Sequence, residues 1–170
     1  THNARLFMGD ITSVEDWKRN IEVGDTALLI AGVRTETETD IVVNANGVEC
    51  YFNAVITENK LPQRVILASS QAVYMGNEQP FREAKEPIPT TIYGESKMLA
   101  EKIAAAWCND LGISLVILRY STVLGRGIGE NSRMSGPLFA WTMAAIEDKP
   151  ISVFQDGKQT RDYVHINDVV

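Results

Sequence analysis

The chain has 170 residues, a length that suits one globular domain with a substantial hydrophobic core. Its composition is that of an ordinary soluble protein, and its formal net charge of −6 argues against binding to nucleic acid or to an anionic membrane surface. No apolar stretch reaches the roughly 18 residues that a membrane-spanning helix needs, so we expect no transmembrane segment.

The cysteines, the histidines and the start of the chain bear on compartment and metal content. Cys50 and Cys108 fit apolar positions of predicted helices without any motif spacing, which indicates buried thiols and a reducing, cytoplasmic setting. Only His2 and His165 are present, so we expect no metal site. The chain begins at Thr1 without a basic segment followed by an apolar one, so we expect no secretory signal peptide.

Short apolar runs alternate with longer segments of helical periodicity. The apolar runs predict strands at residues 5–8, 26–31, 64–68, 113–119 and 151–154. The periodic segments predict helices at residues 13–20, 39–59, 90–111 and 137–147, the first with Ser13 as N-cap. In the helix at 90–111, the helical spacing of Leu99, Ile103 and Trp107 predicts the side that faces the core.

This order of elements is typical of a βαβαβ unit. We expect an α/β fold of the Rossmann type, with a doubly wound, mostly parallel sheet and helices on both faces. Ligands in such sheets bind at the carboxyl ends of the strands. Polar or glycine-containing segments follow four predicted strands, at residues 9–10, 31–32, 69–70 and 120–125, so we expect one site where they converge.

Tyr93 and Lys97 are four residues apart in a predicted helix, so their side chains share one face. An ammonium group beside a phenol favours the phenolate and lowers the pKa of the phenol. Tyr93 is therefore a candidate acid and base near neutral pH. The spacing alone also fits a tyrosine at the edge of the core beside a solvated lysine, but the Ser69-Ser70 pair after a predicted strand favours the catalytic interpretation.

Seven short motifs follow one another along nearly the whole chain. They are Gly9-Asp10-Ile11, Ala31-Gly32, the segment 44–47 (Asn-Ala-Asn-Gly), the segment 69–74 (Ser-Ser-Gln-Ala-Val-Tyr), the segment 93–97 (Tyr-Gly-Glu-Ser-Lys), Leu118-Arg119-Tyr120 and the segment 157–165. Together they resemble the extended short-chain dehydrogenase/reductase family of NAD-dependent nucleotide-sugar epimerases and dehydratases.

The resemblance implies a catalytic group of Ser70, Tyr93 and Lys97, with NAD or NADP as cofactor. For cofactor binding it implies Asp10 and Ile11 at the adenine, Ala31 and Gly32 at the phosphates and ribose, Asn44 near the nicotinamide, and Tyr93, Lys97 and Tyr120. Arg34 is either a solvated loop charge or a contact to a cofactor phosphate.

For substrate binding, the resemblance implies Ser70, Gln71, Thr122, Asn131 and Arg161. Arg161 would bind the diphosphate of a nucleotide-sugar, since the planar guanidinium of arginine binds phosphate in a bidentate way that lysine does not. Two simpler interpretations stay open: Ser70 as a strand-end cap, and Arg161 in a surface ion pair with Asp162.

The chain departs from the family pattern at its start. The opening strand and the Gly-rich phosphate loop of the family are absent, so we interpret the sequence as an internal segment. We expect residues 1–125 to be the remainder of the dinucleotide-binding domain, with the first βαβ missing. Residues 126–170 would begin the substrate-binding region, interleaved with the sheet.

Gln71 and Ala72 narrow the choice of reaction type. Dehydratases of this family carry an Asp-Glu pair there, and neither Gln nor Ala can transfer protons in that way, which disfavours elimination. The sequence therefore predicts an NAD(P)-dependent nucleotide-sugar epimerase that acts by transient hydride transfer, with Tyr93 as acid and base. An NAD(P)-dependent sugar reductase or dehydrogenase and a non-catalytic dinucleotide-binding sensor are the alternatives. The resemblance also implies a homodimer formed through the two long helices.

Overall fold

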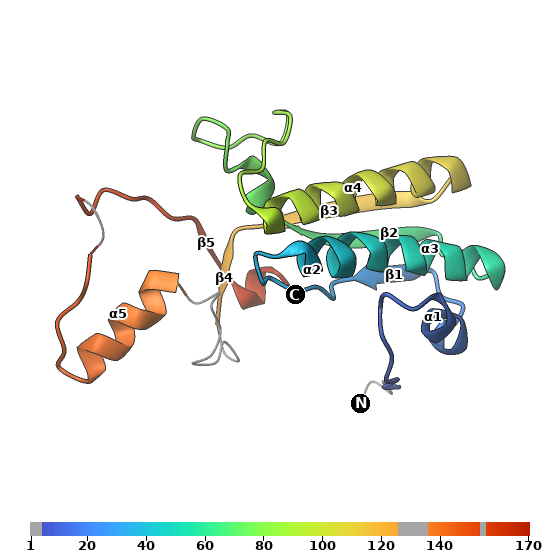
Figure 1. Ribbon diagram of the computed structural model, residues 1–170, viewed down its shortest axis with the longest axis horizontal. Helices are drawn as coiled ribbons and strands as arrows, with labels where there is room; N and C mark the ends of the chain where they lie inside the picture. The colour runs from blue at the N-terminus through green and yellow to red at the C-terminus, as the bar shows by residue number, and fades with distance from the viewer. Residues whose placement is uncertain (1–4, 126–135, 154–155) are drawn as a thin grey trace. The chain divides into compact units, whose positions relative to one another are not determined.

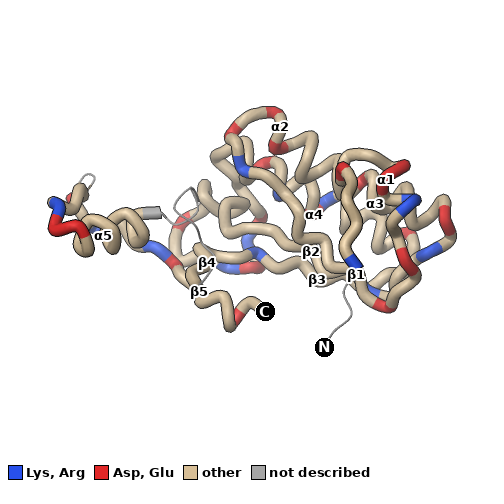
Figure 2. The backbone as a smooth tube through the Cα atoms, turned by 90° about the horizontal axis from the view of Figure 1, so that it is seen from below, with Lys and Arg blue, Asp and Glu red and all other residues tan. Residues whose placement is uncertain are grey.

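The computed structural model describes residues 5–125, 136–153 and 156–170, and the chain divides into two compact units, Thr1–Arg119 and Tyr120–Val170 (Figure 1). Along the chain, Asp and Glu residues are interspersed with Lys and Arg residues (Figure 2). Among the described residues, no helix is both long enough and apolar enough to cross a membrane.

The first unit is built on a three-stranded sheet in the order β1-β2-β3. Its strands are β1 (Thr26–Leu29), β2 (Arg64–Ser70) and β3 (Ser114–Tyr120), and β3 ends on the first residue of the second unit. Strands β1 and β2 are parallel, with Thr26 opposite Arg64 and Leu29 opposite Leu67. Parallel strands alternating with helices confirm the expected α/β, Rossmann-type fold class.

The helical elements of the first unit fall into a short N-terminal helix, an interrupted helix between β1 and β2, and a long helix between β2 and β3. They are α1 (Val14–Asn20), α2 (Glu38–Ile41), the π turn η1 (Val42–Asn46), α3 (Gly47–Thr57), the 3₁₀ turn η2 (Gln71–Tyr74) and α4 (Ile92–Leu111). The predicted N-cap of α1 is confirmed, because the Ser13 hydroxyl accepts a hydrogen bond from the backbone N–H of Asp16 at 3.2 Å.

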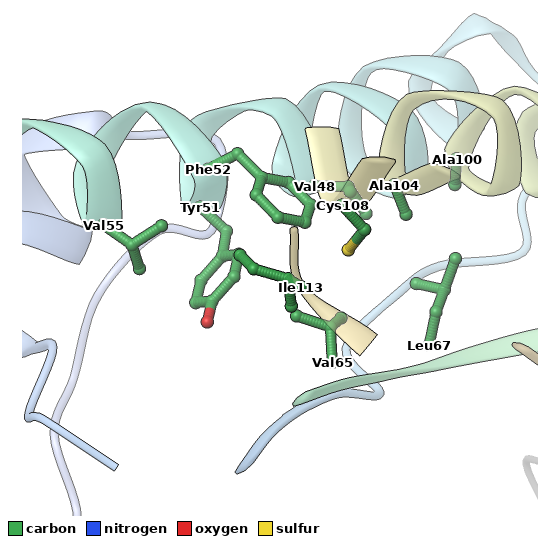
Figure 3. Packing of buried hydrophobic residues seen from close by; sticks show 10 residues of the cluster. All are labelled: Val48, Tyr51, Phe52, Val55, Val65, Leu67, Ala100, Ala104, Cys108 and Ile113. Carbon is green, nitrogen blue, oxygen red and sulfur yellow. The ribbon is translucent and has the colours of Figure 1, made fainter. Parts of the chain in front are cut away.

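The core of the first unit lies between the sheet and the helices α3 and α4, as Figure 3 shows. Phe52 and Val55 of α3 meet Val65 of β2 and Ala104 of α4 in one buried cluster. Right-handed crossovers between strands that follow one another in the sheet place their helices on the same face. Both crossover helices that the structure describes, α3 and α4, accordingly cover the same face of this sheet (Figure 1).

The predicted inner face of α4 is wrong by one residue. Ala100, Ala104 and Cys108 form the buried row, whereas Leu99 is 39% exposed. Ile103 and Trp107 are partly buried at the margin of the core. The small residues permit close approach of α4 to α3 and β2, and a pattern search that weights large apolar residues overlooks them.

The second unit contains a two-stranded parallel sheet and one helix. Its elements are β4 (Thr122–Leu124), α5 (Gly136–Ile146), β5 (Tyr163–His165) and the 3₁₀ turn η3 (Ile166–Asp168). Thr122 lies opposite Tyr163 and Leu124 opposite His165. Gly125 has φ +150°, and a Cβ there would collide with Ile166, so the exit from β4 requires glycine.

Two predicted strands are wrong. Arg5–Met8 has no regular structure, and Leu6 and Met8 are 91% and 89% exposed. The described part of the run at 151–154, residues 151–153, is likewise irregular. Apolar residues alone do not make a strand, because a strand also needs a neighbour that pairs with its backbone.

Candidate functional site

The candidate site of the first unit lies where β1 and β2 end and α4 begins. Ala31 and Gly32 come two and three residues after β1, and both are exposed. Ser69 and Ser70 are the last residues of β2, and Tyr93 lies in the first turn of α4. These are the carboxyl ends of parallel strands, as the sequence predicts.

A glycine brings α4 close to the end of β2. Thr91 caps the helix, its hydroxyl accepting from the backbone N–H of Gly94 at 3.0 Å. A Cβ at Gly94 would lie only 2.7 Å from the carbonyl oxygen of Ala72, so another residue there would push η2 away from the helix. The close packing places Tyr93 beside Ser70.

The Ser70 side chain lies near enough to Tyr93 to act on the proton equilibrium of the phenol. Burial raises the pKa of Tyr93, while the Ser70 side chain and the charge of Arg34 partly offset that rise. The Arg34 guanidinium lies 5.3 Å from the centre of the Tyr93 ring. The pKa of Tyr93 is therefore raised, opposite to the lowering expected from Lys97, because burial of the phenol outweighs the effects of Ser70 and Arg34.

Lys97 lies on the same side of α4 as Tyr93, as its spacing predicts, and is 8% exposed. Its Nζ is 5.9 Å from the Tyr93 ring centre and donates to the carbonyl oxygen of Ala68 at 3.1 Å. Burial lowers the pKa of Lys97, and the negative charge of Glu101 opposes that change.

Asn44 lies in the π turn η1, and its side chain hydrogen-bonds both to the loop after β1 and to α4. Its side-chain oxygen accepts from the backbone N–H of Val33 at 2.8 Å, and its amide donates to the carbonyl oxygen of Val33 and to the hydroxyl of Ser96. Ser96 in turn donates to the carbonyl oxygen of Tyr93 at 2.7 Å. The buried amide therefore links the loop after β1 to the first turn of α4.

Asp40 is a buried carboxylate that the sequence analysis missed. It accepts from the backbone N–H and hydroxyl of Thr35 at 2.7 Å each and from the backbone N–H of Glu36 at 3.1 Å. Burial alone would raise the pKa of Asp40, but these three hydrogen bonds hold it below its usual value. The carboxylate shapes the loop that carries Arg34. Nothing in the local sequence marks Asp40 as unusual, because acidic residues are common in the first turn of a helix.

Asp10 and Ile11 lie before α1. The Asp10 carboxylate accepts from the backbone and the hydroxyl of Thr12, both at 2.8 Å, and these bonds lower the pKa of Asp10. Ile11 lines a cavity of about 120 Å³ together with Ala31, Asn44 and Gly47. Four predicted cofactor residues from three segments, Ile11, Ala31, Gly32 and Asn44, are thus grouped in the first unit.

The predicted substrate residues are spread over both units. Gln71 begins η2, next to Ser70. In the second unit, the backbone N–H of Thr122 donates to the carbonyl oxygen of Asp162 at 3.2 Å, and Arg161 is exposed on a cavity of about 800 Å³ that Trp141 and Tyr163 also line. Tyr120 is half-buried at the end of β3. Asn131 lies outside the described residues.

The fold, with its candidate residues at the carboxyl ends of parallel strands, is that of an α/β protein of the Rossmann type. The model of the NAD dependent epimerase/dehydratase family matches residues 2–170, and the chain belongs to this family.

Curated relatives include the UDP-glucuronate 4-epimerase of Thermodesulfobacterium geofontis and the dTDP-L-rhamnose 4-epimerase of Burkholderia thailandensis. The first is 27% identical over 99% of this chain and 53% of its own length. The second is 26% identical over 98% of this chain and 57% of its own length. The chain therefore spans about half the length of these relatives.

Solved structures agree with the fold. UDP-glucuronic acid 4-epimerase from Bacillus cereus, in complex with UDP-glucuronic acid and NAD, is 28% identical with a TM-score of 0.73 over 95% of this chain and 51% of its own. UDP-glucose 4-epimerase from Thermotoga maritima has a TM-score of 0.82 at 22% identity, over 96% of this chain and 55% of its own, which supports the fold alone.

Proposed function

We propose that the protein containing this chain is an NAD(P)-dependent nucleotide-sugar epimerase. The observation that carries the proposal is the grouping of Ser70, Tyr93 and Lys97 at the carboxyl ends of the strands, in a member of the NAD dependent epimerase/dehydratase family. The relatives that match nearly the whole chain are named as 4-epimerases of UDP- or dTDP-sugars, which supports the same substrate class.

The residues of the first unit fit a dinucleotide. A Cβ at Gly32 would lie 2.6 Å from the Asn44 side-chain oxygen and 3.2 Å from the Lys97 Nζ, so only glycine leaves room for the backbone at this point. Gly32 would lie against the phosphates and ribose, and Asn44 and Lys97 would hold the nicotinamide half. Asp10 and Ile11 would lie at the adenine. When bound, the nicotinamide accepts a hydride from a sugar carbon and returns it.

Side chains of this chain would carry out the proton transfer. The Tyr93 oxygen takes the proton of the sugar hydroxyl as the carbon–hydrogen bond is oxidised, and gives it back when the carbonyl is reduced. The Ser70 hydroxyl donates a hydrogen bond to the same sugar oxygen. The positive charge of Arg34 stabilises the phenolate form of Tyr93 against the effect of burial. The Lys97 ammonium, 5.9 Å from the ring centre, would add to this effect.

We propose that Arg161 binds the diphosphate of the nucleotide-sugar. The exposed guanidinium beside Trp141 and Tyr163 offers a fork for phosphate oxygens and aromatic surfaces for a base or sugar. Gln71 and Ala72, which follow Ser70, supply no acidic group, which supports epimerisation over elimination.

We propose further that the protein forms a homodimer through α3 and α4. Both helices cover one face of the sheet, and Ile56 and Leu99 on their outer sides are 38% and 39% exposed. Apolar side chains on two adjacent helices suit a second pair of helices.

The test of the proposed function is Tyr93→Phe in the full-length protein. The wild type should interconvert a pair of nucleotide-sugar epimers without net production of reduced cofactor, and the variant should lose at least about 10²-fold in kcat because the proton acceptor is gone. Tyr51→Phe serves as the matched control, since Tyr51 lies in the hydrophobic core of the first unit and has no proposed role in binding or proton transfer.

Three results would contradict the proposal. Full turnover by the Tyr93→Phe variant would remove Tyr93 from the mechanism. Stoichiometric production of reduced cofactor by the wild type would identify a dehydrogenase. Cofactor binding without any hydride exchange would identify a sensor.

A further inference from the structure

A buried ionic cluster lies behind the candidate site. We call Ser69, Tyr74, Glu101 and Arg119 the Glu101 cluster. Glu101 is 5% exposed, and its Oε1 accepts from the Ser69 hydroxyl at 2.5 Å and from the Arg119 Nε at 2.9 Å. Its Oε2 accepts from the Arg119 Nη2 at 2.6 Å. Arg119 also donates to the Tyr74 hydroxyl, and its guanidinium lies 4.7 Å from the ring centre.

The Glu101 cluster fastens the end of β2 to α4 one helical turn beyond Lys97. Lys97 binds the carbonyl oxygen of Ala68, and Glu101 binds the side chain of Ser69, so two successive turns of the helix hold two successive residues of the strand. The next residue of the strand is Ser70. The position of Ser70 against Tyr93 therefore depends on both attachments.

The Glu101 cluster also determines where Lys97 points. A carboxylate four residues after a lysine on a helix is a natural partner for the ammonium group. Here the bidentate fork of Arg119 and the Ser69 hydroxyl take up both oxygens of Glu101. The Lys97 ammonium stays on the Ala68 carbonyl, beside the ring of Tyr93.

We propose that Glu101 and Arg119 are positioning residues for the reaction. Their ion pair holds the end of β2 against α4 and keeps the Lys97 ammonium beside Tyr93 instead of on Glu101. The proposal rests on the proposed function, although its principal test does not require turnover.

We expect the charges of Glu101 and Arg119 to have opposite effects on the pKa of Lys97. Glu101 raises the pKa of Lys97 against the effect of burial, so Glu101→Gln should lower that pKa. Arg119→Gln leaves the Glu101 charge without its partner, so it should raise the pKa of Lys97. The other charged groups near Tyr93, namely Arg34, Glu36 and Asp40, are unchanged in both variants.

The experiment is an NMR titration of isotope-labelled lysine in the full-length protein. The Lys97 resonance is assigned by its absence in Lys97→Met. We expect its midpoint to fall by about one pH unit in Glu101→Gln and to rise by a similar amount in Arg119→Gln, with the double variant between them. Lys102→Gln, which removes an exposed charge from the neighbouring position of α4, should leave the midpoint unchanged.

Turnover supplies the second measurement. Glu101→Gln and Arg119→Gln should lower kcat by about tenfold or more with little change in KM, because they misplace the groups that act on the proton. Arg119→Lys keeps the charge and should retain the wild-type titration midpoint. It also provides a folded variant if Arg119→Gln fails to fold.

Two results would overturn the proposal. One is a Lys97 midpoint that stays fixed in Glu101→Gln while kcat falls only in step with thermal stability, which would leave Glu101 a purely structural role. The other is a shift of both single variants in the same direction. A wild-type protein without epimerase activity would instead overturn the proposed function and leave the titration intact as a test of positioning.

Discussion

At the scale of single residues, the pKa of Tyr93 is set by opposing effects. Burial raises the pKa of the phenol, whereas Ser70 and Arg34 lower it. Arg34 was considered from the sequence only as a loop charge or a phosphate contact. The structure places its guanidinium over the ring, where it acts on the proton equilibrium of Tyr93 directly.

Arg34→Gln should therefore raise the pKa of Tyr93 further, by about half a unit to one unit, since it removes a nearby positive charge. The ascending limb of the pH profile of kcat/KM should move to higher pH by the same amount. Ultraviolet absorbance of the phenolate, with Tyr93→Phe subtracted, measures the shift. Arg82→Gln, which removes an exposed charge elsewhere, is the control, and equal titrations of the two variants would refute the role of Arg34.

Asp40 has a pKa below its usual value in the folded chain, so its ionised form stabilises the fold above the unfolded-state pKa, and this contribution is lost as pH falls through the folded-state pKa. Asp40→Asn should lower the free energy of unfolding by about 1–3 kcal/mol at neutral pH, because it disturbs three partly buried hydrogen bonds. The difference from wild type should narrow below about pH 4.

Urea unfolding across the pH range measures this difference. Glu78→Gln, at an exposed position, is the matched control. A penalty for Asp40→Asn that stays constant from neutral to acidic pH would show that the ionised form is not the stabilising one.

At the scale of elements, the approach of α4 to η2 depends on Gly94. Gly94→Ala should cost about 1–3 kcal/mol of stability and separate Tyr93 from Ser70, because the added Cβ meets the Ala72 carbonyl oxygen at 2.7 Å. Gly24→Ala is the control, since a Cβ there has nothing within 4 Å. Thermal unfolding and kcat of both variants test the prediction, and equal behaviour would contradict it.

The extent of the helices was largely predictable because their ends carry local signals. Ser13 and Thr91 accept at the starts of α1 and α4, and Gly112, with φ +67°, ends α4. The π turn around Asn44 was not predictable, since it arises from tertiary hydrogen bonds to Val33 and Ser96. Local periodicity therefore identifies where a helix lies and misses what distorts it.

At the scale of the whole molecule, local patterns in the sequence indicated single candidate residues, but they did not indicate the contacts between distant segments. The Tyr93–Lys97 spacing and the Ser69-Ser70 pair were visible as patterns. The pairing of β4 with β5 and the ion pair of Glu101 with Arg119 join residues far apart in the chain, and nothing in their local sequence indicates a partner.

The proposed homodimer predicts a scattering mass at micromolar concentration of twice one full-length chain. Ile56→Glu with Leu99→Glu should halve that mass, because both side chains lie on the outer sides of α3 and α4. Ile146→Glu, at a 73% exposed position of α5, is the control. A wild-type mass equal to one chain would exclude the dimer.

The π turn at Val42–Asn46 has a consequence for protein engineering. It accommodates one more residue than a regular helix would in the same length, so deleting one residue there should leave an unbroken α-helix with α3 still in register. Phe52 should then stay in the core, whereas an insertion between this turn and Phe52, in regular α-helix, would rotate it by about 100° around the helix axis. Segment exchange with related chains should therefore tolerate the loss of one residue at this turn more readily than a change in residue count within α3.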